Sequence, residues 1–226
     1  MEPLTQTLLD ELRDLALAIA PELPRLYVLK QQPDWPRPDA TIAYVVRGGC
    51  DVIESYLMAT GRWQGHAPII VFVETNLSRG QLLAVLFHEL AHGLPYHAET
   101  YTTPNQTVAE FQEWCQSPPP RRDLQPGWSY GDHGREFTRL ALHLWWRAAI
   151  HGEIAEFEPL CAGMVYDLSP CFMYWKALGN EPIRMKDLTF AEIVSSKPPQ
   201  LFNDFWLADL AHWIKNHPNA LNQEAA

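Results

Sequence analysis

The first twenty residues carry an apolar side chain at every third or fourth position. Leucine occupies positions 4, 8, 12 and 15, and Ile19 continues the series. On a helix this spacing gathers the apolar side chains on one face. We therefore predict an amphipathic helix that ends at Pro21, because proline interrupts the backbone hydrogen bonding of a helix.

Three short apolar runs farther along the chain predict strands. They cover residues 25–29, 41–47 and 67–74, while residues 51–60 fit a helix and a strand equally well. The run at 67–74 is the clearest, because it is rich in β-branched and aromatic residues. An extended peptide can pair with this strand if one of its edges is free. The alternative is a buried central strand.

The segment after this strand has the start and stop signals of a helix. Ser78 and Gln81 are three residues apart, which is the pattern of a capping box. Apolar residues fill the next turns, and Gly93 and Pro95 mark the end. The pattern predicts a helix over residues 79–94.

The second half of the chain begins with a segment that has no helical or strand pattern. Residues 98–130 are rich in proline and turn-forming residues, which predicts a long inserted loop. A second strong helix is expected over residues 132–150. Two further helices are expected over residues 188–195, with Asp187 as N-cap, and 200–216.

Composition and charge narrow the class of protein. The chain has 226 residues, 47% hydrophobic and 19% charged, which suits one globular domain with an extension. Its formal net charge of −10 argues against a nucleic-acid partner, because phosphate backbones attract basic surfaces. No uncharged apolar stretch approaches membrane-spanning length, so no membrane partner is expected.

The cysteines and the N-terminus predict a compartment. None of the four cysteines forms a CxxC pair, which argues against a zinc ribbon. The first residues lack the basic stretch and apolar run of a signal peptide. We expect a cytoplasmic protein with reduced thiols. The alternative is a disulfide between Cys161 and Cys171.

The first candidate for chemistry is the sequence His-Glu-Leu-Ala-His at positions 88–92. Residues four apart share a helix face, so His88 and His92 can bind one metal ion. Zn²⁺ accepts neutral imidazole nitrogen, and Glu89 can take a proton from a water that the ion activates. The alternative is a chance match of a short motif on an ordinary helix.

A catalytic zinc site needs a third protein ligand, with the fourth place left to water. The compact pattern HExxHxxGxxH fails, because position 95 is Pro and position 98 is Ala. We expect the third ligand to be His133, in the first turn of the predicted second helix and on one inward face with Phe137. Gly134 beside it would let the two helices approach closely. The other candidates are Glu136, His97, His143 and His151.

Further polar residues stand near these motifs. Tyr96, His97 and Tyr130 each offer a donor for the oxyanion that forms in peptide hydrolysis. Packing or solvent contact is the more ordinary role for each of them. Asp132 is either a hydrogen-bond partner of a zinc-binding histidine or the N-cap of the second helix.

Together the two motifs resemble those of a known family. In the SprT-like, or Spartan-like, zincins an HExxH helix precedes a second helix that starts with His-Gly-x-x-Phe, as in His133-Gly134-Arg135-Glu136-Phe137 here. The resemblance implies that His88, His92 and His133 bind zinc and that Glu89 is the catalytic base. The segment between the motifs is longer than is usual in that family.

The expected fold is α+β and zincin-like, with a small mixed sheet packed on the HExxH helix and on a second ligand-bearing helix. Residues 1–150 would form the metallopeptidase domain, and residues 151–226 a mostly helical extension packed on it. The expected function is zinc-dependent hydrolysis of a protein or peptide substrate. The alternatives are a non-catalytic, zinc-stabilised binding or scaffold protein and a hydrolase that acts on another amide.

Overall fold

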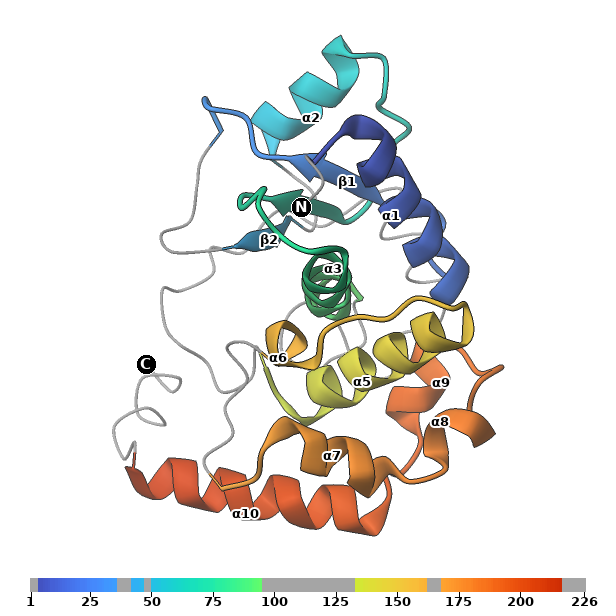
Figure 1. The fold of residues 1–226 in the computed structure, drawn as a ribbon, viewed down its shortest axis with the longest axis vertical. Coiled ribbons are helices and arrows are strands. Elements are labelled where there is room, and N and C mark those ends of the chain that lie inside the picture. The colour runs from blue at the N-terminus through green and yellow to red at the C-terminus, as the bar shows by residue number, and fades with distance from the viewer. Residues whose placement is uncertain (1–3, 36–41, 47–49, 95–132, 162–167, 217–226) are drawn as a thin grey trace.

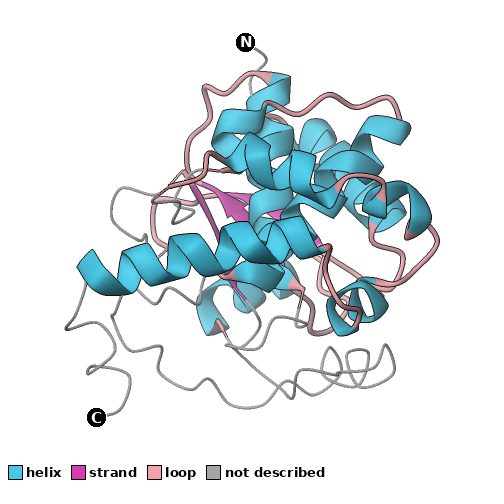
Figure 2. Cartoon of the chain, turned by 90° about the horizontal axis from the view of Figure 1, so that it is seen from below, coloured by secondary structure: helices cyan, strands magenta, loops and turns pink. Residues whose placement is uncertain are grey.

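The computed structural model describes residues 4–35, 42–46, 50–94, 133–161 and 168–216. These residues form one small mixed sheet and a larger number of helices, most of them in the second half of the chain (Figures 1 and 2). The prediction of an α+β fold is confirmed at this level.

The first half of the chain alternates helices and strands. Its elements are α1 (Gln6–Ile19), β1 (Tyr27–Lys30), β2 (Ala43–Val46), α2 (Asp51–Ala59), β3 (Ile69–Phe72) and α3 (Arg79–Gly93). The predicted N-terminal helix and the three predicted strands are confirmed, each strand being shorter than its apolar run. The ambiguous segment at 51–60 is a helix.

The three strands are arranged in the order β1-β3-β2. β1 runs parallel to β3, with Tyr27 opposite Ile69, and β2 runs antiparallel to it, with Ala43 opposite Phe72. The central strand β3 is buried along its whole length, as expected for a continuous apolar run covered on both faces. Both of its edges are paired, so the prediction that a peptide adds to this strand is wrong.

Strand side chains alternate between the two faces of the sheet, and each face packs on different helices. Leu29 and Val71 belong to one apolar cluster together with Ile53 of α2. Val28 and Ile70 belong to the main cluster, which also contains the buried residues of α1 and α3. The sheet therefore lies between α2 on one side and α1 with α3 on the other (Figure 1).

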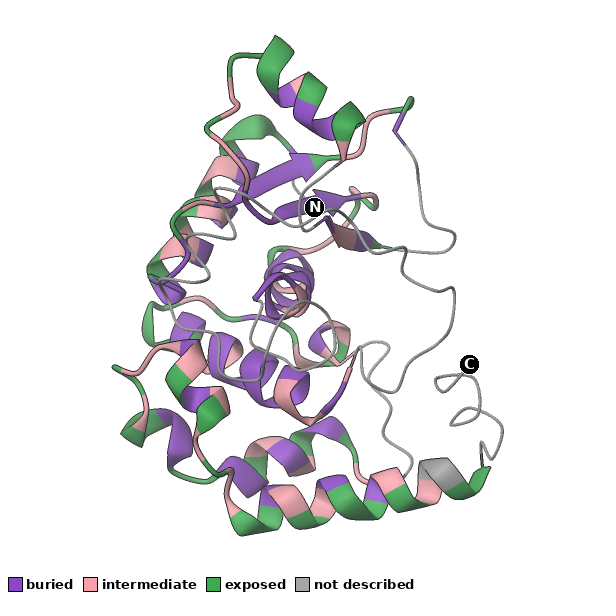
Figure 3. Cartoon of the chain, turned by 180° about the vertical axis from the view of Figure 1, so that it is seen from behind, coloured by how far each residue is buried: buried purple, intermediate pink, exposed green. Residues whose placement is uncertain are grey.

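Helix α3 lies at the centre of the molecule and is buried on nearly every side (Figure 3). Its start is the predicted capping box: the Ser78 side chain accepts a hydrogen bond from the Gln81 N–H at 3.1 Å, and the Gln81 side chain accepts one from the Ser78 N–H at 2.8 Å. Its end is at Gly93. Leu94, which precedes a proline in the sequence, has the extended backbone that this position favours.

The second half of the described chain is helical. Its elements are α5 (Arg135–Ile150), α6 (Phe157–Leu160), α7 (Cys171–Leu178), α8 (Glu181–Arg184), α9 (Phe190–Ser195) and α10 (Gln200–Asn216). Helix α10 has the predicted bounds. Helix α5 begins three residues later than predicted, with Gly134 as its N-cap. The N-cap of α9 is Thr189, not Asp187 as predicted, because Thr189 forms a capping box with Glu192.

The C-terminal helices share a core with the N-terminal half. One cluster of buried apolar residues contains Leu8 of α1, Leu86 of α3, Leu140 of α5 and Phe190 of α9. A buried ion pair adds to this contact: the Arg139 guanidinium of α5 donates to both carboxylate oxygens of Glu181, at 2.8 and 3.1 Å. A domain boundary at residue 150 stays a prediction.

Two of the cysteines are joined. Cys161 and Cys171 form a disulfide, with their Cα atoms 6.3 Å apart. The prediction of reduced thiols is wrong for this pair, and the alternative pairing is the one in the structure. Cys50 is a free thiol, and Cys115 lies outside the described residues. Of the helices that the structure describes, none combines the length and the apolar character needed to cross a membrane.

Candidate metal centre

Three histidines from two separate segments meet beside α3. His88 and His92 lie one turn apart on α3, and His133 lies directly before Gly134, the N-cap of α5. One ring nitrogen from each of them lies within 4.8 Å of the other two, a group that could hold a metal ion. His133 is therefore brought to the predicted place, although it precedes the helix rather than belonging to its first turn.

The distances between the ring nitrogens fit a shared ion. The Nε2 atom of His133 lies 3.1 Å from Nε2 of His92 and 3.2 Å from Nε2 of His88. Two nitrogens that each bind a tetrahedral zinc at about 2.0–2.1 Å are about 3.3–3.4 Å apart. A neutral Nε2 carries either one hydrogen or one lone pair, so it can form only one well-directed hydrogen bond with its two neighbours. A cation between the three nitrogens can accept a lone pair from each of them.

The orientation of His88 is set by a hydrogen bond on the far side of its ring. Its Nδ1 lies 3.0 Å from the carbonyl oxygen of Leu160, the last residue of α6. A carbonyl only accepts, so this Nδ1 carries the hydrogen and the lone pair stays on Nε2, which faces His133. Metal-binding histidines are commonly fixed by a second hydrogen bond of this kind.

The protonation of the cluster also suits a metal. Burial lowers the pKa of His88, against the opposing effect of its hydrogen bond to Leu160. Burial, with a smaller contribution from His88, lowers the pKa of His133 to about 3. Both rings are therefore neutral at pH 7, and neutral imidazole is the form that binds a metal ion.

Among the described residues, one aromatic side chain contacts all three histidines. Phe137, in the first turn of α5, is fully buried. Its ring centroid lies 4.2 Å from that of His92, 4.9 Å from that of His133 and 5.1 Å from that of His88. Phe137 thus forms a rigid apolar support on which the three imidazoles rest.

Glu89 follows His88 in the same turn of α3 and is almost completely buried, with 9% of its surface exposed. A carboxylate that follows a metal-binding histidine on a helix can reach a water on the metal without being a ligand itself. The position of Glu89 in the chain is therefore compatible with the role predicted for it.

The other candidates for the third ligand that the structure describes are either paired with another residue or exposed. Glu136 accepts a hydrogen bond from Arg135 at 2.7 Å. His143 is fully buried, and its Nε2 lies 2.8 Å from a carboxylate oxygen of Glu181. His151 is exposed at the end of α5. The remaining predicted residues, Tyr96, His97, Tyr130 and Asp132, lie outside the described residues.

The contribution of Leu160 could not be found from the sequence. Leu160 is 72 positions from His88 and acts through its backbone carbonyl, which every residue has. No residue type or spacing indicates such a contact, so it can be identified only in the folded structure.

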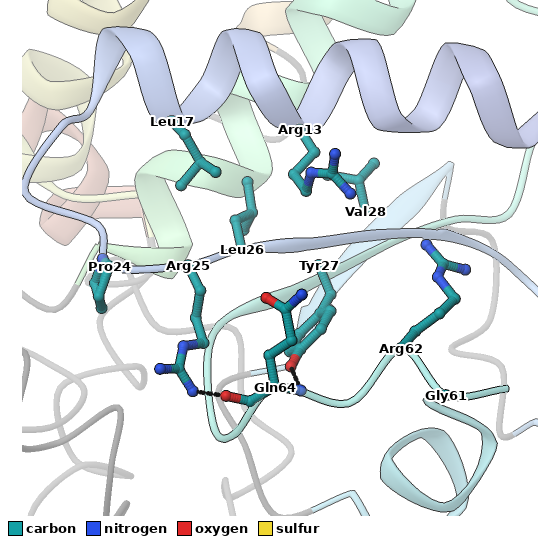
Figure 4. A pocket seen from close by; sticks show the side chains of 10 residues that line it. All are labelled: Arg13, Leu17, Pro24, Arg25, Leu26, Tyr27, Val28, Gly61, Arg62 and Gln64. Carbon is teal, nitrogen blue, oxygen red and sulfur yellow. Dashed lines mark hydrogen bonds between the residues drawn. The ribbon is translucent and has the colours of Figure 1, made fainter. Parts of the chain in front are cut away.

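Two cavities lie elsewhere in the described part of the chain. One, of about 450 Å³, lies between α1, β1 and the turn after α2 and is lined by three arginines (Figure 4). Each guanidinium already has a partner: Arg13 donates to Asp10 and Asp14, Arg62 to Gln6, and Arg25 to the Gln64 carbonyl. The second, of about 380 Å³, adjoins the start of α5 and the segment before α10. The three histidines line neither cavity.

Comparisons with known proteins add no assignment. No protein-family model matches the chain, and no match was found among curated proteins or solved structures. The interpretation of the site therefore depends on the residues and distances given above.

Proposed function

We propose that this chain is a zinc-dependent peptidase, with His88, His92 and His133 as metal ligands and Glu89 as general base. The observation that carries the proposal is the meeting of three Nε2 atoms from two segments, one of them an HExxH helix. A site with three protein ligands and one open position is typical of catalytic zinc, whereas structural zinc usually has four protein ligands.

Zinc is the proposed ion because of the donor set. Three neutral imidazoles suit zinc, copper, iron and nickel, and the two histidines of an HExxH helix are best known as ligands of zinc. When bound, zinc lowers the pKa of a coordinated water toward about 7. Other residues of the chain orient the three histidines: the Leu160 carbonyl fixes the tautomer of His88, and Phe137 contacts all three rings.

In this proposal Glu89 transfers the proton during hydrolysis. Its carboxylate accepts a proton from the attacking water and then delivers it to the amine that leaves when the peptide bond breaks. We also propose that the chain is a zincin of the SprT-like kind. The support is the order of the two motifs, together with the contacts of His133 and Phe137 to the HExxH histidines.

The test separates metal binding from catalysis with one conservative substitution. Glu89→Gln keeps the size of the side chain but cannot accept the proton. We expect this variant to bind as much zinc as the wild type and to hydrolyse an unstructured protein substrate at least about 100-fold more slowly, the lower limit for loss of a general base. Zinc content and cleavage rate are measured on the same preparations.

The matched control is Glu136→Gln, which changes the glutamate that accepts a hydrogen bond from Arg135 in α5. We expect this variant to keep both zinc and hydrolysis. Full activity in Glu89→Gln would exclude Glu89 from the mechanism. Zinc binding without hydrolysis in the wild type would instead favour the zinc-stabilised binding or scaffold protein.

A further inference from the structure

The backbone carbonyl that orients His88 belongs to a very short helix. Leu160 ends α6, which has four residues, and its side chain is fully buried. A helix of four residues is not stable by itself, because nucleation costs more than one turn of hydrogen bonds returns. The position of the Leu160 carbonyl therefore depends on how the two ends of α6 are held.

The N-terminal end of α6 is held by the start of α3. The N–H of Glu156, the N-cap of α6, donates to the carbonyl of Gly80 at 2.9 Å. The Glu156 carboxylate also accepts a hydrogen bond from the hydroxyl of Ser78, the N-cap of α3. The helix that carries His88 and His92 thus holds one end of the helix that orients His88.

The C-terminal end of α6 is held by the disulfide. Cys161 directly follows Leu160 and is bonded to Cys171, the first residue of α7. Helix α7 is itself fixed in the core, because the fully buried Tyr174 donates a hydrogen bond to Asp209 of α10. The disulfide therefore connects the residue next to the Leu160 carbonyl to an anchored helix.

We propose that the Cys161–Cys171 disulfide is a positioning device for the metal centre, and that its reduction lowers the affinity of the centre for metal. The reductant is a dithiol, which gives two electrons and two protons to the S–S bond, leaving two protein thiols and becoming a disulfide itself. Without the cross-link, the Leu160 carbonyl holds the His88 Nδ1–H less firmly. This inference rests on the metal site of the proposed function.

The expected effect has a known scale. Loss of a hydrogen-bond partner behind a metal ligand lowers metal affinity by about 10- to 100-fold. We expect the oxidised protein to bind zinc about 10- to 100-fold more tightly than the reduced protein. The overall fold should be retained, because reduction breaks the S–S bond but leaves both side chains at the apolar cluster that contains the buried residues of α3 and α5.

The experiment uses the full chain and measures zinc affinity by competition with a chromophoric chelator. Wild-type protein is compared before and after reduction with a dithiol, which is removed under nitrogen before the titration. The double variant Cys161→Ser, Cys171→Ser has no thiols at these positions and is expected to bind zinc weakly under both conditions. Cys50→Ser, which removes a free thiol, is expected to behave like the wild type.

Equal zinc affinity in the oxidised and the reduced wild type would overturn the inference and leave the metal site intact. So would the finding, by thiol titration of air-oxidised protein, that Cys161 and Cys171 are free. If the oxidised wild type binds no metal, the proposed site itself fails. Circular dichroism shows whether each sample is folded, and the reduced wild type gives the comparison if the double variant does not fold.

Discussion

Each histidine of the candidate metal centre contacts a neighbour that holds its ring. His88 is oriented by the Leu160 carbonyl, and all three histidines contact Phe137. His133 precedes the regular backbone of α5, so the helix itself does not hold its ring. The ring instead lies against Phe137 and the two α3 histidines. Contact with the fully buried Phe137 is therefore the feature that the three histidines have in common.

Phe137→Ala tests this support. We expect the variant to lose about 3–5 kcal/mol of unfolding free energy, as is usual when a buried phenylalanine is truncated. We also expect weaker zinc binding, because the imidazoles lose the surface against which they rest. Urea denaturation in the presence of a chelator measures the first effect, and zinc competition measures the second.

Phe137→Leu is the matched control, because leucine fills most of the space and keeps the contact apolar. It should cost less stability than Phe137→Ala and retain tighter zinc binding. Zinc affinity in folded Phe137→Ala equal to that of the wild type would show that the ring does not position the ligands.

The sequence predicted which histidines lie close together, but it did not predict their surroundings. The four-residue spacing of His88 and His92 places both on one face of a helix whatever the rest of the fold does. His133 follows from the second motif. The hydrogen bond from His88 to Leu160 depends on a backbone group brought close by tertiary structure, and for this reason no sequence pattern indicates it.

At the scale of the elements, local signals predict the helices with a cap or an amphipathic pattern, whereas the four-residue helices depend on tertiary contacts. The capping box at Ser78 and the apolar run that follows were sufficient to predict α3. Helices α6 and α8 have four residues each and were not predicted, since so short a helix depends on its neighbours. The start of α5 was misplaced because Gly134 caps it with an extended backbone and no side-chain hydrogen bond.

The N-cap of α9 gives a direct test at this scale. The Thr189 side chain accepts a hydrogen bond from the Glu192 N–H at 3.2 Å, whereas Asp187 is exposed two residues earlier. We expect Thr189→Ala to lower the unfolding free energy by about 1 kcal/mol, the usual cost of removing a cap. Asp187→Ala should change it by less than about 0.5 kcal/mol. A larger loss from Asp187→Ala in urea denaturation would show that the cap is misassigned.

At the scale of the whole molecule, buried charges join the C-terminal helices to α5. Glu181 of α8 is fully buried and accepts hydrogen bonds from Arg139, while His143 contacts the same carboxylate. Arg139 also donates to the carbonyl of Ser196, beyond the end of α9. Since α5 begins two residues after His133, the C-terminal part supports the helix next to this histidine of the candidate metal centre.

We therefore expect Glu181→Ala to lower the unfolding free energy of the whole chain. Removing one member of a buried ion pair leaves the other charge without compensation and costs about 3–5 kcal/mol. We expect one cooperative unfolding transition at a lower urea concentration than in the wild type. Circular dichroism and tryptophan fluorescence should both report this same transition. The exposed Asp34→Ala is the control and should have little effect. Two separate transitions would show that residues 151–226 unfold as an independent unit.

The measurement that tests the central claim most directly is a zinc titration of the wild type, His133→Ala and His151→Ala, with stoichiometry and affinity determined together. Three ligands meeting at one ion predict a single zinc per wild-type chain, a loss of at least about 100-fold in affinity for His133→Ala, and unchanged binding for His151→Ala, which alters an exposed histidine at the end of α5. Wild-type affinity in His133→Ala would contradict the three-histidine centre.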